Sequence, residues 1–319
     1  MSAIRHRRGP AHRLCVTAAG ALLVLLPRAS FAHSTEHAPT LAHAWSLSPW
    51  LLVPGAALLA LYLVGLARLW SRAGLGRGIA RREVAAFAGG VVALFAALVW
   101  PLDAFGEWSL AAHMGQHMLL LALAPPLLLL GRPAAALAHA VPMRVASATQ
   151  RLFAPLQHAA TSALAPATAV HVAVMGLWHL PDATAAALAQ EGLHWAMHAS
   201  FLIAGLWFWA AMLHRMRDRE TGIGAALVAV IVVMMQMGFV GALLTFAPRP
   251  LYAPYLQRAP ALGLDALADQ QLAGLIMWVP ASVPYLVGGL WLLVAWMARL
   301  DRRSSAAAPR ERPGRGTAS

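Results

Sequence analysis

The chain has 319 residues, of which 60% are hydrophobic and 11% are charged, and its mean hydropathy is +0.63. A soluble fold of this length could not bury so much apolar surface, so these values predict an integral membrane protein in contact with membrane lipid. The formal net charge of +12 does not indicate nucleic-acid binding, because the arginines fall in short clusters between apolar segments and form no basic stripe.

Residues 1–32 predict a cleavable secretory signal peptide. Arginines precede an apolar stretch from Leu14 to Leu26, and Ser30 and Ala32 supply small residues at the cleavage-determining positions. This stretch is shorter than the roughly 20 residues that cross a bilayer, which favours cleavage. The single cysteine, Cys15, lies in the same segment. Disulfides and Cys-x-x-Cys motifs are therefore excluded, and a metal site needs His, Met or carboxylate ligands.

Residues 33–48 would then begin the mature chain, outside the membrane. They contain His33, His37 and His43, and His-rich starts of this kind can capture metal ions. The alternative interpretation is a solvated tail in which three histidines fall by chance.

Residues 49–300 predict an all-α polytopic bundle of about seven transmembrane helices. Seven apolar segments have roughly bilayer-spanning length, and the second is the shortest. They cover residues 49–70, 84–100, 110–131, 160–180, 193–213, 222–246 and 270–298.

Charged residues in the loops predict the orientation of this bundle. Arginines concentrate after the first, third, fifth and last segments, whereas the alternate loops hold acidic residues. Arginine-rich loops stay in the cytoplasm, so the mature N-terminus is expected outside and the C-terminus inside. Residues 301–319 lack apolar periodicity and predict a disordered cytoplasmic tail. The loops are too short for a soluble catalytic domain, so we expect the spans and their rims to carry the function. Nothing in this function is expected to need catalysis, so we do not expect an enzyme.

Histidines recur at one predicted depth near the outer ends of three spans. His113 and His117 lie one helical turn apart on the third span, and His194 and His198 repeat that spacing on the fifth. His179 ends the fourth span, which runs the opposite way, so it reaches the same layer. Histidine inside a span is costly and indicates function.

These five histidines predict a metal site, because neutral imidazole is a common ligand and a pair one turn apart can chelate. The nearest acids in the sequence, Glu191 and Asp269, suit supporting roles behind the ligands. Methionines Met234, Met235 and Met237 lie mid-way along the sixth span, and others occur elsewhere in the spans. Thioether with imidazole favours copper, although methionine is also a common core filler.

Haem is the main competing ligand. Histidines one turn apart lie on the same side of a macrocycle, so axial pairs would have to join different spans. Pro125 and Pro126 on the third span, and Pro280 and Pro284 on the seventh, should kink their helices and could open the bundle for either ligand.

Several motifs resemble the multi-spanning cytochrome c oxidase assembly factors of the CtaG type, which are found with caa-type oxidases. The matching stretches, in order over about residues 45–300, are His113 to Leu120, Ala124 to Pro126, Gly131 to Pro133, Leu177 to Pro181, His194 to Leu202 and Asp269 to Trp278. One departure is Met197, where many relatives are expected to carry an acid.

This resemblance implies a helical protein of the bacterial plasma membrane that is needed for maturation of cytochrome c oxidase. It implies that copper is bound transiently and delivered to the haem-copper centre of oxidase subunit I. Subunit I and a periplasmic copper donor are the implied partners.

Three other functions remain open from the sequence. A copper permease or copper-resistance membrane protein would need polar groups along an inward path, for which His171 and Gln236 are the candidates. A haem-bearing membrane electron carrier would absorb visible light. A pure scaffold would use the histidines for hydrogen bonds alone.

Overall fold

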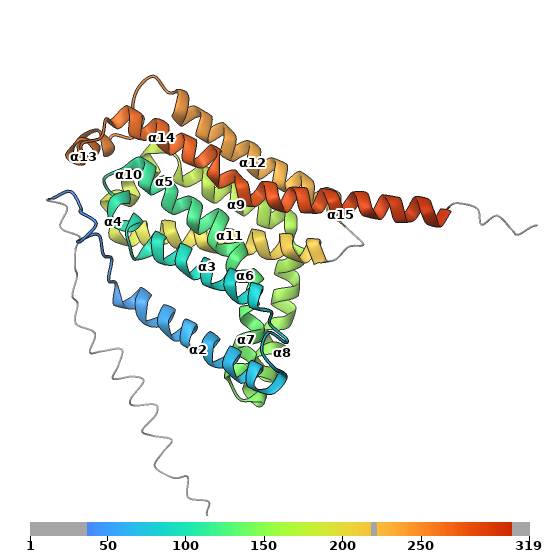
Figure 1. Cartoon of the computed structure of the whole chain (residues 1–319). Helices are drawn as coiled ribbons and strands as arrows, with labels where there is room; N and C mark the ends of the chain where they lie inside the picture. Colours follow the sequence, from blue (N-terminus) through green and yellow to red (C-terminus); the bar gives the residue numbers. More distant parts are fainter. Residues whose placement is uncertain (1–36, 218–221, 308–319) are drawn as a thin grey trace, which may run out of the picture. The chain divides into compact units, whose positions relative to one another are not determined.

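Helices account for all the regular secondary structure in the part of the chain that the computed structural model describes, residues 37–217 and 222–307 (Figure 1). The predicted signal peptide and the last residues of the predicted tail, 308–319, lie outside these ranges. The final helix continues to Ala307, through the first part of that tail.

The helices follow one another with short connections. In chain order they are α2 (Pro49–Ala73), α3 (Arg81–Leu98), α4 (Leu102–Gly106), α5 (Leu110–Met118), η1 (Leu119–Leu123), α6 (Ala124–Leu130), α7 (Pro133–Ala140), α8 (Met143–Ser162), α9 (Leu164–Trp178), α10 (Pro181–Ala189), α11 (Glu191–Arg217), α12 (Ile223–Phe246), α13 (Tyr255–Ala261), α14 (Ala266–Trp278), η2 (Pro280–Ser282) and α15 (Val283–Ala307).

Five helical segments of the described chain are long and apolar enough to cross a membrane, or six if α8 and α9 are counted together as one bent span. The five are Pro49–Ala73, Leu110–Leu130, Glu191–Met216, Ile223–Phe246 and Ala266–Leu300. The fold is therefore the expected all-α membrane bundle. The predicted second segment, 84–100, corresponds to α3, whose 18 residues begin with Arg81, Arg82 and Glu83. These charges leave α3 with less apolar length than the other spans.

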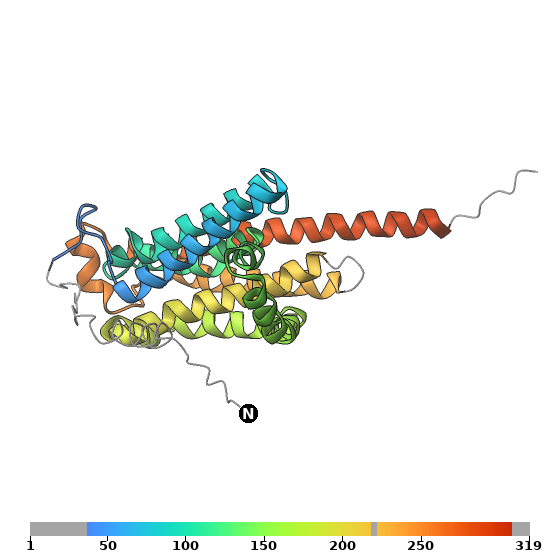
Figure 2. The same ribbon diagram turned by 90° about the horizontal axis from the view of Figure 1, so that it is seen from below.

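The predicted fourth span is broken at Ala163, where α8 and α9 meet at 75°. Pro166 provides the physical reason, because proline lacks the N–H that would bond the Ser162 carbonyl. Arg215 of α11 supplies the missing donor, with its Nη2 3.0 Å from the Ser162 oxygen. Trp207 likewise donates to the Ala160 oxygen at 3.0 Å. As a result α8 runs across the direction of the neighbouring spans (Figures 1 and 2).

The span that carries His113 and His117 is also irregular. Its middle, η1, is a π-helical turn directly before Pro125 and Pro126, and such turns often accompany functional sites. Gly205 of α11 packs against this turn. A Cβ at Gly205 would lie 2.7 Å from the Leu121 oxygen and 2.8 Å from Pro125 Cγ, so glycine permits the close approach of the two histidine-bearing helices.

A Gly205→Val substitution should lower the free energy of unfolding by about 1–3 kcal/mol, because the added side chain has no room. The measurement is thermal unfolding of the detergent-purified protein. Gly55→Val is the matched control, since nothing lies within 4 Å of a Cβ there. Equal unfolding midpoints for the two variants would contradict the close contact.

Candidate metal centre

The five predicted histidines come together between α5, the end of α9 and α11. The rings within each helical pair are in contact, with centroids 4.2 Å apart for His113 and His117 and 4.4 Å apart for His194 and His198. His113 and His194 face each other across the two helices at 6.0 Å with nearly parallel rings.

His117 lies at the centre of this group, which we call the histidine layer. Its ring centroid is 5.7 Å from that of His179 and 5.8 Å from that of His198. Phe201 packs on the same ring at 4.2 Å and covers one side of the layer. His113, His117, His179 and His198 are buried, whereas His194 is partly exposed.

Hydrogen bonds to backbone carbonyls orient two of these rings. His113 Nδ1 lies 3.2 Å from the Gly106 oxygen, and His179 Nδ1 lies 2.6 Å from the Met175 oxygen. A carbonyl only accepts, so Nδ1 must carry the proton and Nε2 keeps its lone pair. Metal-binding histidines are usually held by a partner on the other ring nitrogen in this way.

Two tyrosines hold the outer rim of the layer. The Tyr255 hydroxyl donates to the Gly106 oxygen at 2.8 Å, and the Tyr252 hydroxyl donates to the His179 oxygen at 2.7 Å. Burial raises the pKa of both tyrosines, so both hydroxyls stay protonated and remain donors.

Several buried ring nitrogens of the layer have no hydrogen-bond partner among the described residues. They are Nε2 of His113, Nε2 of His179, and both ring nitrogens of His117 and of His198. Each such group typically costs about 1–3 kcal/mol when left unsatisfied, and native proteins rarely tolerate several together. The donor set therefore fits a metal ion.

Asp103 of α4 brings a buried carboxylate to the layer. Ligand atoms of Asp103, His194 and His198 all lie within 4.8 Å of one another. The Asp103 carboxylate also accepts from Ser46 Oγ at 2.5 Å and from Gln116 Nε2 at 3.0 Å. Sequence reasoning named Glu191 and Asp269 as the nearby acids and missed Asp103. Only its position between two spans, on the side of the histidines, could have suggested it.

Asp269 instead supports the helix that carries His113 and His117. Its carboxylate accepts from the Leu110 N–H at 2.6 Å and from Ser109 Oγ at 2.7 Å, so it caps the start of α5 from α14. A carboxylate at a helix N-terminus satisfies free amides and complements the helix dipole. Glu191 is exposed in the first turn of α11.

The remaining candidates lie in other surroundings. His171 Nε2 is 3.0 Å from the Tyr285 hydroxyl, and its ring packs on Phe208. Gln236 donates to the Val172 oxygen at 2.8 Å. Methionines of the spans mostly fill the hydrophobic core; these are Met114, Met118, Met197, Met237 and Met277. His43 is exposed and lies 3.0 Å from Thr40 Oγ1.

Replacing Asp269 with Asn should lower the free energy of unfolding by about 1–3 kcal/mol, because it weakens charged hydrogen bonds to the buried start of α5. Thermal unfolding in detergent measures this. Asp182→Asn, at an exposed first-turn position of α10, is the control. An Asp269 variant as stable as this control would show that the cap contributes little.

A family model described as cytochrome c oxidase caa3 assembly factor (Caa3_CtaG) matches residues 60–299. The match covers well over half of the chain and includes the whole histidine layer. No curated protein and no solved structure matches the chain.

Proposed function

Because the chain belongs to the cytochrome c oxidase caa3 assembly factor family, we propose that its histidine layer binds copper transiently and delivers it to the haem-copper centre of oxidase subunit I. The observation that carries this proposal is the set of buried, unpartnered imidazole nitrogens beside the Asp103 carboxylate. Binding and release need no bond-making chemistry, so the protein acts as a carrier and not as an enzyme.

Asp103, His194 and His198 are the proposed first ligands. Three protein ligands leave a coordination position open, which suits an ion that must be handed on. Imidazole nitrogen with carboxylate oxygen is a donor set that Cu(II) accepts, whereas thioether would favour Cu(I). His113, His117 and His179 lie within reach to form a second set of nitrogen ligands as the ion moves through the layer.

We place this layer near the outer membrane face, in a bundle that crosses the membrane seven times. In this topology α3 is the second crossing and α9 is the fourth, while α8 stays at the cytoplasmic surface. The arginines of the α2–α3 loop and the acids Asp103 and Asp182 occupy opposite ends of the helices, which supports this orientation. A periplasmic copper donor could then load the layer from outside.

Haem is a weaker candidate for the same place. A macrocycle needs a slot between the helices, but each histidine ring of the layer lies within 6.4 Å of at least one other, and Phe201 packs directly on His117. The polar path that a copper permease would need is also weak, because Tyr285 and the Val172 carbonyl already hold one polar atom each of His171 and Gln236.

The purified protein should retain copper in near-stoichiometric amount and show no Soret band. Double substitutions His113→Ala with His117→Ala, and His194→Ala with His198→Ala, should each reduce copper retention at least about tenfold, because the chelating pair is lost. Elemental analysis and a visible spectrum measure this. The control is the double substitution of the exposed His139 and His158. If all variants kept copper, the proposed site would be refuted. A Soret band would indicate bound haem. If the purified protein showed neither copper nor a Soret band, only the scaffold function would remain.

In cells that depend on this protein for a caa3-type oxidase, the His113→Ala, His117→Ala variant should yield an oxidase with normal haem and reduced copper. The reason is that copper delivery would fail while the helical scaffold persists. Metal and haem content of the isolated oxidase measure this. An oxidase with full copper would contradict a delivery role even if the assembly factor itself binds the ion.

A further inference from the structure

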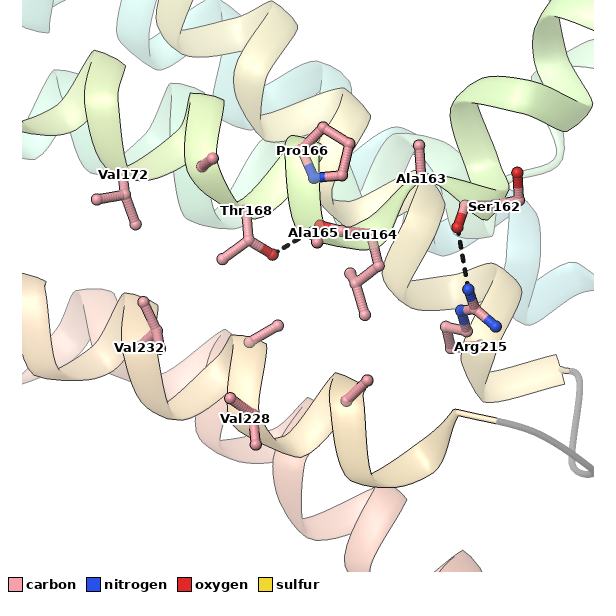
Figure 3. A pocket seen from close by; sticks show the side chains of 13 residues that line it. Ser162, Ala163, Leu164, Ala165, Pro166, Thr168, Val172, Arg215, Val228 and Val232 are labelled. Atoms are coloured by element: carbon pink, nitrogen blue, oxygen red, sulfur yellow. Dashed lines mark hydrogen bonds between the residues drawn. The ribbon is translucent and has the colours of Figure 1, made fainter.

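An apolar groove lies between α9 and α12, beside the junction of α8 and α9 (Figure 3). Its volume is about 670 Å³, within the range of sites for small organic ligands. Val172 and Val232 line it away from the junction, and Leu164 and Val228 lie closer to it. The groove is separate from the histidine layer, because no residue of the layer lines it.

The lining selects an apolar occupant. Besides alanines, valines, a leucine and a proline, it contains Ser162, Thr168 and Arg215. Thr168 donates its hydroxyl hydrogen to the Leu164 oxygen of its own helix at 2.8 Å. This hydroxyl is therefore already satisfied without a ligand. Val228, with 59% of its surface exposed, borders the groove on α12. Because the groove runs along two membrane helices, a lipid acyl chain is the ligand that best fits it.

Arg215 gives the groove one charged end. Its Nη2 is fixed by the Ser162 carbonyl that Pro166 leaves free, and its Nε is buried without a partner among the described residues. The planar guanidinium carries five donors and matches the geometry of a phosphate group. A ligand with an apolar chain and a phosphate at one end would satisfy both parts of the site.

The neighbouring helix α8 places Arg215 at headgroup level. Val145, Leu152 and Leu156 lie on one face of α8 and are exposed, Leu152 by 70% and Leu156 by 65%. Arg144 and Arg151 lie on another side, and α8 contains no acidic residue. A helix of this kind, bent 75° away from α9, is typical of one that lies in the membrane interface and attracts anionic lipids.

We propose that this groove binds one anionic phospholipid, with an acyl chain between α9 and α12 and the phosphate on the Arg215 guanidinium. The ligand comes from the leaflet that contacts α8. The site is independent of the proposed copper role, because none of its side chains belongs to the histidine layer.

The test is native mass spectrometry of the full chain after exchange into phosphatidylglycerol or phosphatidylcholine of the same acyl composition. The wild type should retain one phosphatidylglycerol through delipidation and much less phosphatidylcholine. Arg215→Gln should reduce retained phosphatidylglycerol at least about tenfold, Arg215→Lys should preserve part of it, and Val228→Trp should displace it by filling the groove. Arg249→Gln, at an exposed position in the connection between α12 and α13, is the control.

The proposal is overturned if the two lipids are retained equally, if the wild type retains neither, or if Arg215→Gln retains as much as the control. It is also overturned if inorganic phosphate displaces the lipid signal, because the site would then recognise a free anion. Thermal unfolding in detergent reports folding of each variant. If Arg215→Gln fails to fold, the headgroup preference of the wild type and the Val228→Trp variant still decide the outcome.

Discussion

A backbone carbonyl released by a helix break at a membrane must find a donor, and this constraint shapes the junction of α8 and α9. Arg215 meets it by bonding the Ser162 carbonyl that Pro166 leaves free. The same device orients the candidate metal centre. His113 and His179 satisfy carbonyls at the ends of short helices and thereby turn their other ring nitrogens toward the layer. The irregular backbone and the candidate metal ligands therefore depend on the same kind of hydrogen bond, from a side chain to a backbone carbonyl.

The sequence could predict those parts of the site that follow from helix periodicity. His113 with His117, and His194 with His198, are one turn apart, so each pair had to share a face, and their depth followed from span direction. Asp103 could not be predicted in the same way, because its contacts with Ser46 and Gln116 depend on how a connecting segment folds back against the bundle. Tertiary contacts of this kind leave no periodic trace in a single sequence.

The fold shows the same division. All-α membrane architecture follows from composition, and five to six helical segments of the described residues are long and apolar enough to cross a membrane. The break at Ala163 was hidden because residues 160–180 are predominantly apolar and contain no charged side chain, and only Pro166 signals that the helix must turn. The π turn before Pro125 shows the complementary case, in which a proline alters helical geometry without ending the span. A proline therefore breaks the helix at one position of this chain and leaves the span continuous at another.

The contact of Gly205 with Leu121 and Pro125 limits how the histidine layer can work. Because α11 and η1 approach this closely at Gly205, a shift of one helix along the other would require this contact to be repacked, which favours a constant register of the two histidine pairs. In the proposed carrier role, an ion would then pass from one pair to the other by rotation of imidazoles about their χ angles. Exposed side chains rotate on the picosecond-to-nanosecond timescale, and packing against Phe201 would slow this rotation for His117. The exchange rate at this centre would be governed by aromatic packing and not by motion of the bundle.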